Sequence, residues 1–298
     1  MTYRSETFAV PVRAPRRRGP VLLLSPSVLF LILAFGLPMG LMLGTSFVDL
    51  STGSLTLRHY ERFLTDGLSL YGLGRTAGMS AMVAVCVTCL GYPLAYYLAR
   101  SSGRVRAIVF ALALAPELAG VVLRTYGWLI ILEDHGVINR SLMTLGLIAQ
   151  PLPLSKNLFA VVVGLTHVIL PFGVLALMAS IQSIDVNLQR AAQMLGASPI
   201  SILRHVLLPL SVPGIVSSLL LSFTMAASAY ATPALLGGAG FKVLATMVAD
   251  QVLFYLDWPF AAVMATVLLV MMSMISFLGL RFEQSRRLDQ HVRLERAS

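Results

Sequence analysis

The chain of 298 residues is 57% hydrophobic and 12% charged, with a mean hydropathy of +0.83, so it has too few polar side chains to cover a water-soluble globule. A helix that crosses a bilayer needs about 20 apolar residues, and the length leaves room for roughly five to seven such helices with short loops. Large catalytic or soluble ligand-binding domains are therefore largely excluded, and the net charge of +9 must be divided between two membrane sides before it can indicate a nucleic-acid partner.

Six apolar segments follow one another along the chain, and each is long enough to span a bilayer. They cover residues 21–47, 76–99, 107–132, 158–181, 212–236 and 259–280. The first follows a cluster of arginines, but it far exceeds the ~7–15 apolar residues of a cleaved secretory signal, so we interpret it as an uncleaved signal-anchor helix. Prolines within the segments predict kinked helices. We therefore predict an all-α integral membrane protein with six transmembrane helices.

Basic side chains are distributed unequally between the two sides of such a protein. With six spans, both termini and loops two and four share one side. That side carries fifteen arginines, namely Arg4, Arg13, Arg16, Arg17, Arg18, Arg100, Arg104, Arg106, Arg190, Arg204, Arg281, Arg286, Arg287, Arg293 and Arg296. The other side carries six basic residues: Arg58, Arg62, Arg75, Arg140, Lys156 and Lys242. Because cytoplasmic loops carry the excess of Lys and Arg, we predict that both termini are cytoplasmic.

This topology divides the chain into a basic N-terminal tail over 1–20, a transmembrane domain over 21–281 and a C-terminal tail over 282–298. Loop four, at about 182–211, is unusual because it lies on the cytoplasmic side and yet is rich in apolar residues.

Two short helices with a break between them are expected in loop four. The first has apolar residues at helical spacing, Leu188, Ala191, Ala192 and Leu195. Gly196 then supplies a helix-ending residue, and Ser198 with Pro199 forms an N-cap followed by proline at the first helical position. A second helix over 200–207 leads into prolines that turn the chain into the fifth span. The loop either packs on its own bundle or projects as a knob for a partner's groove.

At these residues the sequence resembles the Glu-Ala-Ala loop of permease subunits of binding-protein-dependent ABC importers. The motif covers Arg190, Ala191, Ala192, Leu195, Gly196, Ala197, Ser198 and Pro199, followed by residues 207–210 and 212–215. The resemblance implies the type I ABC importer permease fold, in which this loop forms coupling helices that dock into a cleft of a separate ATPase subunit. One position departs from the family pattern, because Arg190 stands where the motif has its glutamate.

Two further stretches are similar to the spermidine/putrescine-type permeases within that family. They are residues 123–128, continued at 136–139 and 145–147, and residues 230–238 with Gln251 and Trp258-Pro259 beyond. The resemblance implies a bacterial cytoplasmic (inner) membrane protein that works with a second permease subunit, two cytoplasmic ATPase subunits and an extracytoplasmic solute-binding protein. It implies a small, polyamine-like solute, although related importers carry other small solutes.

Nothing in the sequence supplies an energy source or a catalytic centre. A P-loop needs a lysine followed by serine or threonine, whereas Lys156 and Lys242 are followed by Asn157 and Val243. We therefore expect no enzyme activity, no cofactor, no metal and no nucleic-acid partner, with ATP bound by another chain. His167, deep in the fourth segment, is expected to be a hydrogen-bonded packing residue.

Glu117 and Arg124 are the charged residues within a span and thus candidates for the solute path. Seven residues apart, they are separated by about 10–11 Å in an unbroken helix, which excludes a direct ion pair. A break at Pro116 would place Glu117 at the start of a second half-helix, where the dipole favours a carboxylate. Tyr126 and the outer-loop acid Asp250 complete the candidate path. The other interpretation is that both charges pair with the second permease subunit or lie near a membrane surface.

A stand-alone secondary transporter or channel, driven by an ion gradient, is the alternative function. Its signature would be a relay of ionisable residues or an inverted repeat with broken helices, and the sequence shows neither beyond Glu117 and Arg124. A membrane-embedded enzyme ranks third, because no metal or nucleophile constellation is evident.

Overall fold

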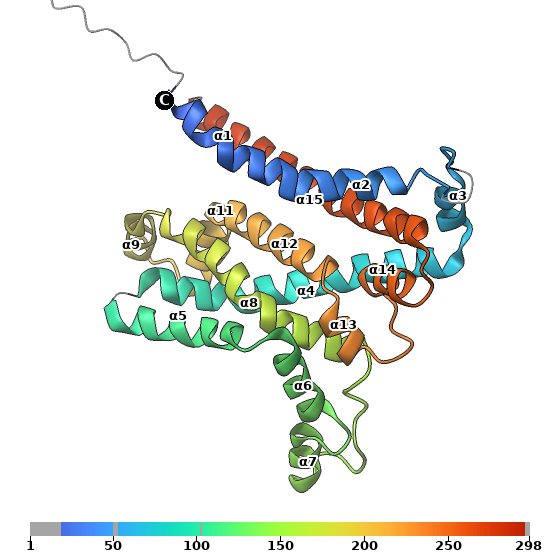
Figure 1. Cartoon of the computed structure of the whole chain (residues 1–298). Coiled ribbons are helices and arrows are strands. Elements are labelled where there is room, and N and C mark those ends of the chain that lie inside the picture. Colours follow the sequence, from blue (N-terminus) through green and yellow to red (C-terminus); the bar gives the residue numbers. More distant parts are fainter. Residues whose placement is uncertain (1–18, 50–52, 102, 296–298) are drawn as a thin grey trace, which may run out of the picture.

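The computed structural model describes residues 19–49, 53–101 and 103–295, and nearly all regular structure in these ranges is helical (Figure 1). A single β-bridge in the described ranges joins Val48 to Leu55. The predicted all-α class is confirmed. In chain order the helices are α1 (Gly19–Leu31), η1 (Ile32–Gly36), α2 (Leu37–Thr45), α3 (Arg58–Thr65), α4 (Gly67–Arg100), α5 (Gly103–Leu118), α6 (Val121–Leu132), α7 (Val137–Thr144), α8 (Leu158–Gln182), α9 (Val186–Met194), α10 (Pro199–Ile202), η2 (Leu203–Leu207), α11 (Leu208–Leu210), α12 (Val212–Ala227), α13 (Ala231–Leu236), α14 (Leu244–Leu253) and α15 (Trp258–Glu295).

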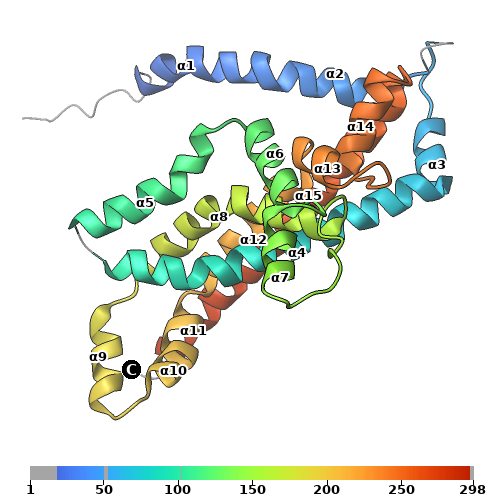
Figure 2. The same cartoon turned by 90° about the horizontal axis from the view of Figure 1, so that it is seen from below.

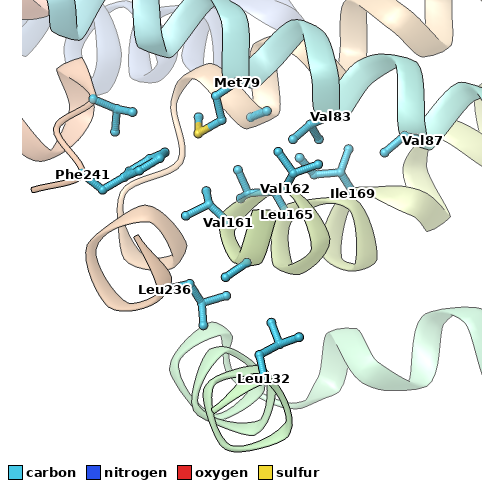
Figure 3. Packing of buried hydrophobic residues seen from close by; sticks show 13 residues of the cluster. Met79, Val83, Val87, Leu132, Val161, Val162, Leu165, Ile169, Leu236 and Phe241 are labelled. Carbon is cyan, nitrogen blue, oxygen red and sulfur yellow. The ribbon is translucent and has the colours of Figure 1, made fainter. Parts of the chain in front are cut away.

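Helices α4, α8 and α12 pack on one another and form the centre of the bundle (Figures 1 and 2). Figure 3 shows the buried apolar side chains of α4, among them Val83 and Val87, facing those of α8, among them Leu165 and Ile169. Close approach depends on small residues, since a Cβ added at Gly173 of α8 would overlap Val87. Small residues at such contacts let membrane helices approach closely, and van der Waals packing then stabilises the bundle.

The first span is a continuous helix with one π-helical turn. It runs through α1, η1 and α2, close to the predicted range 21–47. The π turn at Ile32–Gly36 ends two residues before Pro38, which has no N–H to donate to the preceding turn, and the wider turn accommodates the missing donor. The segment Ser25–Thr45 buries none of its residues against the rest of the chain, and Figure 2 shows α1 apart from the bundle. Its apolar surface is thus available to lipid or to another subunit.

Four helical segments of the described residues are long and apolar enough to cross a membrane. They are Ser25–Thr45, Gly67–Arg100, Leu158–Gln182 and Trp258–Phe282. A fifth span results if Pro199–Leu210 and Val212–Ala227, which meet at a bend of 68°, are counted together. These segments agree with five of the six predicted spans.

The predicted third span, 107–132, is broken rather than continuous. It consists of α5, with 16 residues, and α6, with 12 residues, separated at residues 119 and 120. At 1.5 Å per residue, α5 rises about 24 Å, which is less than the ~30 Å of bilayer hydrocarbon. The six-span count therefore remains a prediction that depends on α5 and α6 acting together.

One further boundary differs from that predicted. The fifth span was expected over 212–236, but α12 ends at Ala227 and residues 231–236 form the separate helix α13. The last candidate span ends at Phe282, beside the predicted start of the C-terminal tail, and α15 continues beyond it as a helix to Glu295. The N-terminal tail at 1–20 lies almost wholly outside the described residues.

Candidate functional site

Loop four has the predicted helix, glycine, helix arrangement. Asp185 caps the start of α9, because its carboxylate accepts a hydrogen bond from the Asn187 N–H at 2.9 Å. The chain leaves α9 through Gly196, whose φ of +80° lies in the left-handed region that favours glycine. The Ser198 hydroxyl then accepts from the Ser201 N–H at 3.3 Å, and Pro199 takes the first position of α10. Each of these signals is local in the sequence.

One side of loop four is anchored to its own chain. Ala192 and Ala197 are half-buried and pack against the cluster formed by Ile184, Ile202 and Leu207. On α4, Tyr96 donates a hydrogen bond from its hydroxyl to the Gln189 side-chain oxygen at 3.3 Å. The loop is therefore positioned by α4 and by its own second helix.

The opposite side of loop four leaves large apolar side chains uncovered. Met194 is 90% exposed, Leu195 is 88% exposed and Ile200 is 77% exposed. Ala191 and Arg190 are exposed beside them. Figure 2 shows α9 and α10 extending beyond one end of the bundle. The structure thus separates the predicted knob into an inner side around Ala192 and an outer tip around Leu195.

We define this outer tip by Met194, Leu195 and Ile200. Adjacent exposed side chains of this size, on an end of the molecule that extends past the membrane-crossing helices, are typical of a protein interaction site. The second helix of the loop continues through η2 and α11 to the 68° bend and then into α12. A force on the tip would therefore reach a helix of the central bundle.

Glu117 and Arg124 form an ion pair across the break between α5 and α6. Arg124 Nη1 donates to Glu117 Oε1, and the side chains are 10% and 24% exposed, respectively. The predicted separation of about 10–11 Å, which would exclude the pair, applies only to an unbroken helix. The break at residues 119 and 120 brings the two side chains together. The expected position of Glu117 at the start of a second half-helix is wrong, because α5 continues past Pro116 and Glu117 lies in its last turn.

The remaining polar groups on α6 have separate roles. Trp128 Nε1 donates to His167 Nδ1 at 3.3 Å, and the two rings meet edge to face, as expected for a hydrogen-bonded packing histidine. Tyr126 is exposed and lies two positions from Arg124. Residues i and i+2 of a helix do not share a face. The structure therefore does not bring Tyr126 to the ion pair.

Asp250 belongs to a different region, a polar cavity of about 670 Å³ between α3, α14 and α15. Its carboxylate pairs with Lys242 Nζ at 2.7 Å. A second pair in the same cavity joins Arg62 to Asp257, also at 2.7 Å. Sequence reasoning missed this second contact, because its partners are 195 positions apart and no local pattern connects them.

Asp66, in the wall of this cavity, caps the start of α4. Its carboxylate accepts hydrogen bonds from the Leu68 and Ser69 N–H groups and from the Ser69 hydroxyl. The pKa of Asp66 is lowered, chiefly because the Ser69 hydroxyl stabilises the charged form. Aspartate at the start of an apolar helical run was a local signal for this cap.

Comparison with known proteins gives consistent matches over most of the chain. A family model described as binding-protein-dependent transport system inner membrane component matches residues 88–288. The spermidine/putrescine transport system permease protein PotB of Escherichia coli is 32% identical over 271 residues, covering 89% of this chain and 98% of that protein. PotB of Haemophilus influenzae is 28% identical over 241 residues, covering 81% of this chain and 83% of that protein.

Solved structures extend the similarity to the fold. A bacterial alginate ABC transporter, determined in complex with an alginate pentasaccharide-bound periplasmic protein, contains a chain that superposes with a TM-score of 0.74 at 18% identity, over 90% of this chain and 94% of that one. An inward-facing MetNI methionine ABC transporter gives a TM-score of 0.56 at 19% identity, over 74% of this chain and 96% of that one.

Proposed function

The chain belongs to the family of binding-protein-dependent transport system inner membrane components, and from this premise we propose that it is the permease subunit of an importer for a polyamine-like solute. It crosses the bacterial inner membrane with both termini in the cytoplasm and pairs with a second permease subunit. Two cytoplasmic ATPase subunits bind and hydrolyse ATP, and an extracytoplasmic solute-binding protein delivers the solute. The fifteen to six division of basic residues supports the orientation.

The outer tip of loop four is the observation that carries this proposal. Met194, Leu195 and Ile200 are almost fully exposed at the end of the bundle, while the inner side of the loop is fixed by packing. The ATPase-coupling loop comprises Arg190, Ala191, Ala192, Leu195, Gly196, Ala197, Ser198 and Pro199. Burial of the tip in a cleft of the ATPase would remove its apolar surface from water, at about 25 cal/mol per Å² of apolar area.

The same loop supplies the mechanical connection. When the ATPases close on ATP, they push on the tip, and the second helix transmits the displacement through the 68° bend to α12. Helix α12 packs on both α4 and α8, so its movement rearranges the central bundle between outward-open and inward-open states. The permease needs no ATP site of its own.

The similarity to PotB, which is named as a spermidine/putrescine permease, supports a polyamine-like solute. The path is proposed to include Glu117, Arg124, Tyr126 and Asp250. Of these, Glu117 is the best suited to meet an amine, because a carboxylate attracts a cation that a guanidinium repels, and this difference is large where water is excluded. Its 24% exposure leaves part of the side chain accessible.

Copurification with the ATPase tests the proposal. Leu195→Glu should abolish copurification and ATP-driven uptake without harming the fold, because the side chain is 88% exposed. The matched control is Leu145→Glu, at a 72% exposed leucine in the loop after α7. If Leu195→Glu retained both ATPase binding and uptake, loop four would not be the dock. Calorimetric titration of the cognate solute-binding protein with putrescine and spermidine tests the solute separately.

A further inference from the structure

We propose that Arg124 is a displaceable counter-ion for Glu117, and that the ammonium group of the solute takes the place of its guanidinium as the solute passes the break between α5 and α6. The inference rests on the proposed function, because it needs a cationic solute. It assigns Arg124 a role in specificity and release, which a purely structural ion pair would not have.

The position of Glu117 favours a cation beside its carboxylate. The last turn of a helix carries the negative end of the helix dipole, so a carboxylate there is destabilised, and the cost increases within a membrane. Arg124 provides the compensating charge from the first turns of α6. Contact with the guanidinium, or with another cation, therefore stabilises the charged carboxylate while the path is empty.

The exposed fractions of the two side chains indicate which partner a second cation can reach. Arg124 is the more enclosed partner, at 10% exposure, whereas Glu117 is 24% exposed. A cation can thus approach the open part of the carboxylate while the guanidinium remains on the enclosed side. The two cations would compete for one anion, and the incoming charge would replace the outgoing one without leaving Glu117 unpaired.

Arg124 uses only part of its hydrogen-bonding capacity. Its contact with Glu117 joins one nitrogen to one oxygen, so it lacks the two parallel bonds of a fork-to-fork pair. Its Nε is buried and has no acceptor among the described residues. The geometry therefore leaves part of the guanidinium's hydrogen-bonding capacity unused.

This arrangement would prevent the solute from being trapped. Passage through a membrane requires a site that attracts the solute and also releases it. With Arg124 present, binding of the amine gains one contact with Glu117 and loses another, so the net affinity stays low. Without Arg124, the amine would relieve an uncompensated buried carboxylate and would bind much more tightly.

Two measurements on the assembled importer test this inference. The first is equilibrium binding of labelled spermidine to the purified permease and ATPase complex without its binding protein. The second is the maximal rate of spermidine uptake into proteoliposomes with saturating loaded binding protein. We expect Arg124→Gln to bind spermidine about tenfold more tightly, which corresponds to about 1.4 kcal/mol, and to lower the maximal uptake rate. Arg140→Gln, at an exposed arginine of α7, is the control and should change neither value.

The neutral double variant Glu117→Gln/Arg124→Gln distinguishes exchange from structure. Under the exchange model it assembles but shows no tightened binding, because the carboxylate is gone. Unchanged binding and uptake in Arg124→Gln would overturn the inference. It would also be overturned if Arg124→Gln failed to assemble while the double variant recovered the full wild-type uptake. If the wild-type importer took up no amine, the proposed function would be wrong, whereas wild-type amine uptake with an unaffected Arg124→Gln contradicts the exchange alone.

Discussion

Gly196 offers a sharp test of how loop four transmits force, because its role depends on backbone conformation alone. Its φ is +80°, and a Cβ built at this position meets no atom within 4 Å. A substitution therefore creates no clash, and its effect comes from strain in the left-handed region. That strain costs roughly 1–2 kcal/mol for an L-residue, and asparagine adopts this region more readily than other residues. The loop would relieve the strain by changing the relative direction of α9 and α10.

We expect ATPase coupling to be reduced least in Gly196→Asn, more in Gly196→Ala and most in Gly196→Val. Membrane insertion should be unchanged. A cost of 1–2 kcal/mol corresponds to about a 5- to 30-fold shift between the competent and altered loop. The assay is solute-stimulated ATPase activity per copurified complex. Gly146→Val is the matched control, since Gly146 has a φ of +69° and equally open surroundings in a different loop. Wild-type coupling in Gly196→Val, or an equal loss in Gly146→Val, would refute the reasoning.

Three other predictions follow from charge and packing. Reporter fusions should lie outside at Gly240 and inside at Ser201, and an inside signal at Gly240 would contradict the assignment of the last two spans. Arg190→Glu should weaken copurification with the protein's own ATPase, whose facing surface should be acidic or neutral, and an unchanged yield would show that this charge is not at the interface. Gly173→Val should destabilise the bundle by about 1–3 kcal/mol through overpacking, as measured by thermal unfolding in detergent. Gly78→Val, at a glycine with open surroundings, should cause a much smaller loss.

The sequence predicts loop four well because each of its signals acts over a few residues. An N-cap, a left-handed glycine and a proline at the first helical position fix the backbone without help from distant parts of the chain. The same is true of the apolar spans, since their length and composition alone decide whether they suit a bilayer. What the sequence leaves open is which side of loop four packs inward, because Ala192 and Leu195 are both apolar and only their tertiary neighbours distinguish them.

Breaks within apolar segments are harder to predict. Pro116 indicated an interruption of the third segment, but α5 continues for two residues beyond it and the chain bends at Gly120, where ψ is 148°. Proline removes one donor and crowds the preceding turn, yet whether the helix then ends depends on the contacts that remain for it. Ion pairs between distant residues, such as Arg62 with Asp257, depend entirely on tertiary folding and have no sequence signal.

Loop four and the break between α5 and α6 have opposite mechanical requirements in the proposed mechanism. At loop four, the proposed coupling requires that a small movement of the ATPase reach α12, and the loop is capped, packed on its inner side and connected through consecutive helical turns. At the break between α5 and α6, the proposed exchange requires that a solute can come and go, and the ion pair across the break leaves Arg124 Nε without an acceptor among the described residues. A well-packed apolar contact at that break would hold it more firmly but would give an amine nothing to exchange with. The proposed exchange therefore requires an interaction between Glu117 and Arg124 that can be interrupted, and the variants that separate exchange from structure test this requirement directly.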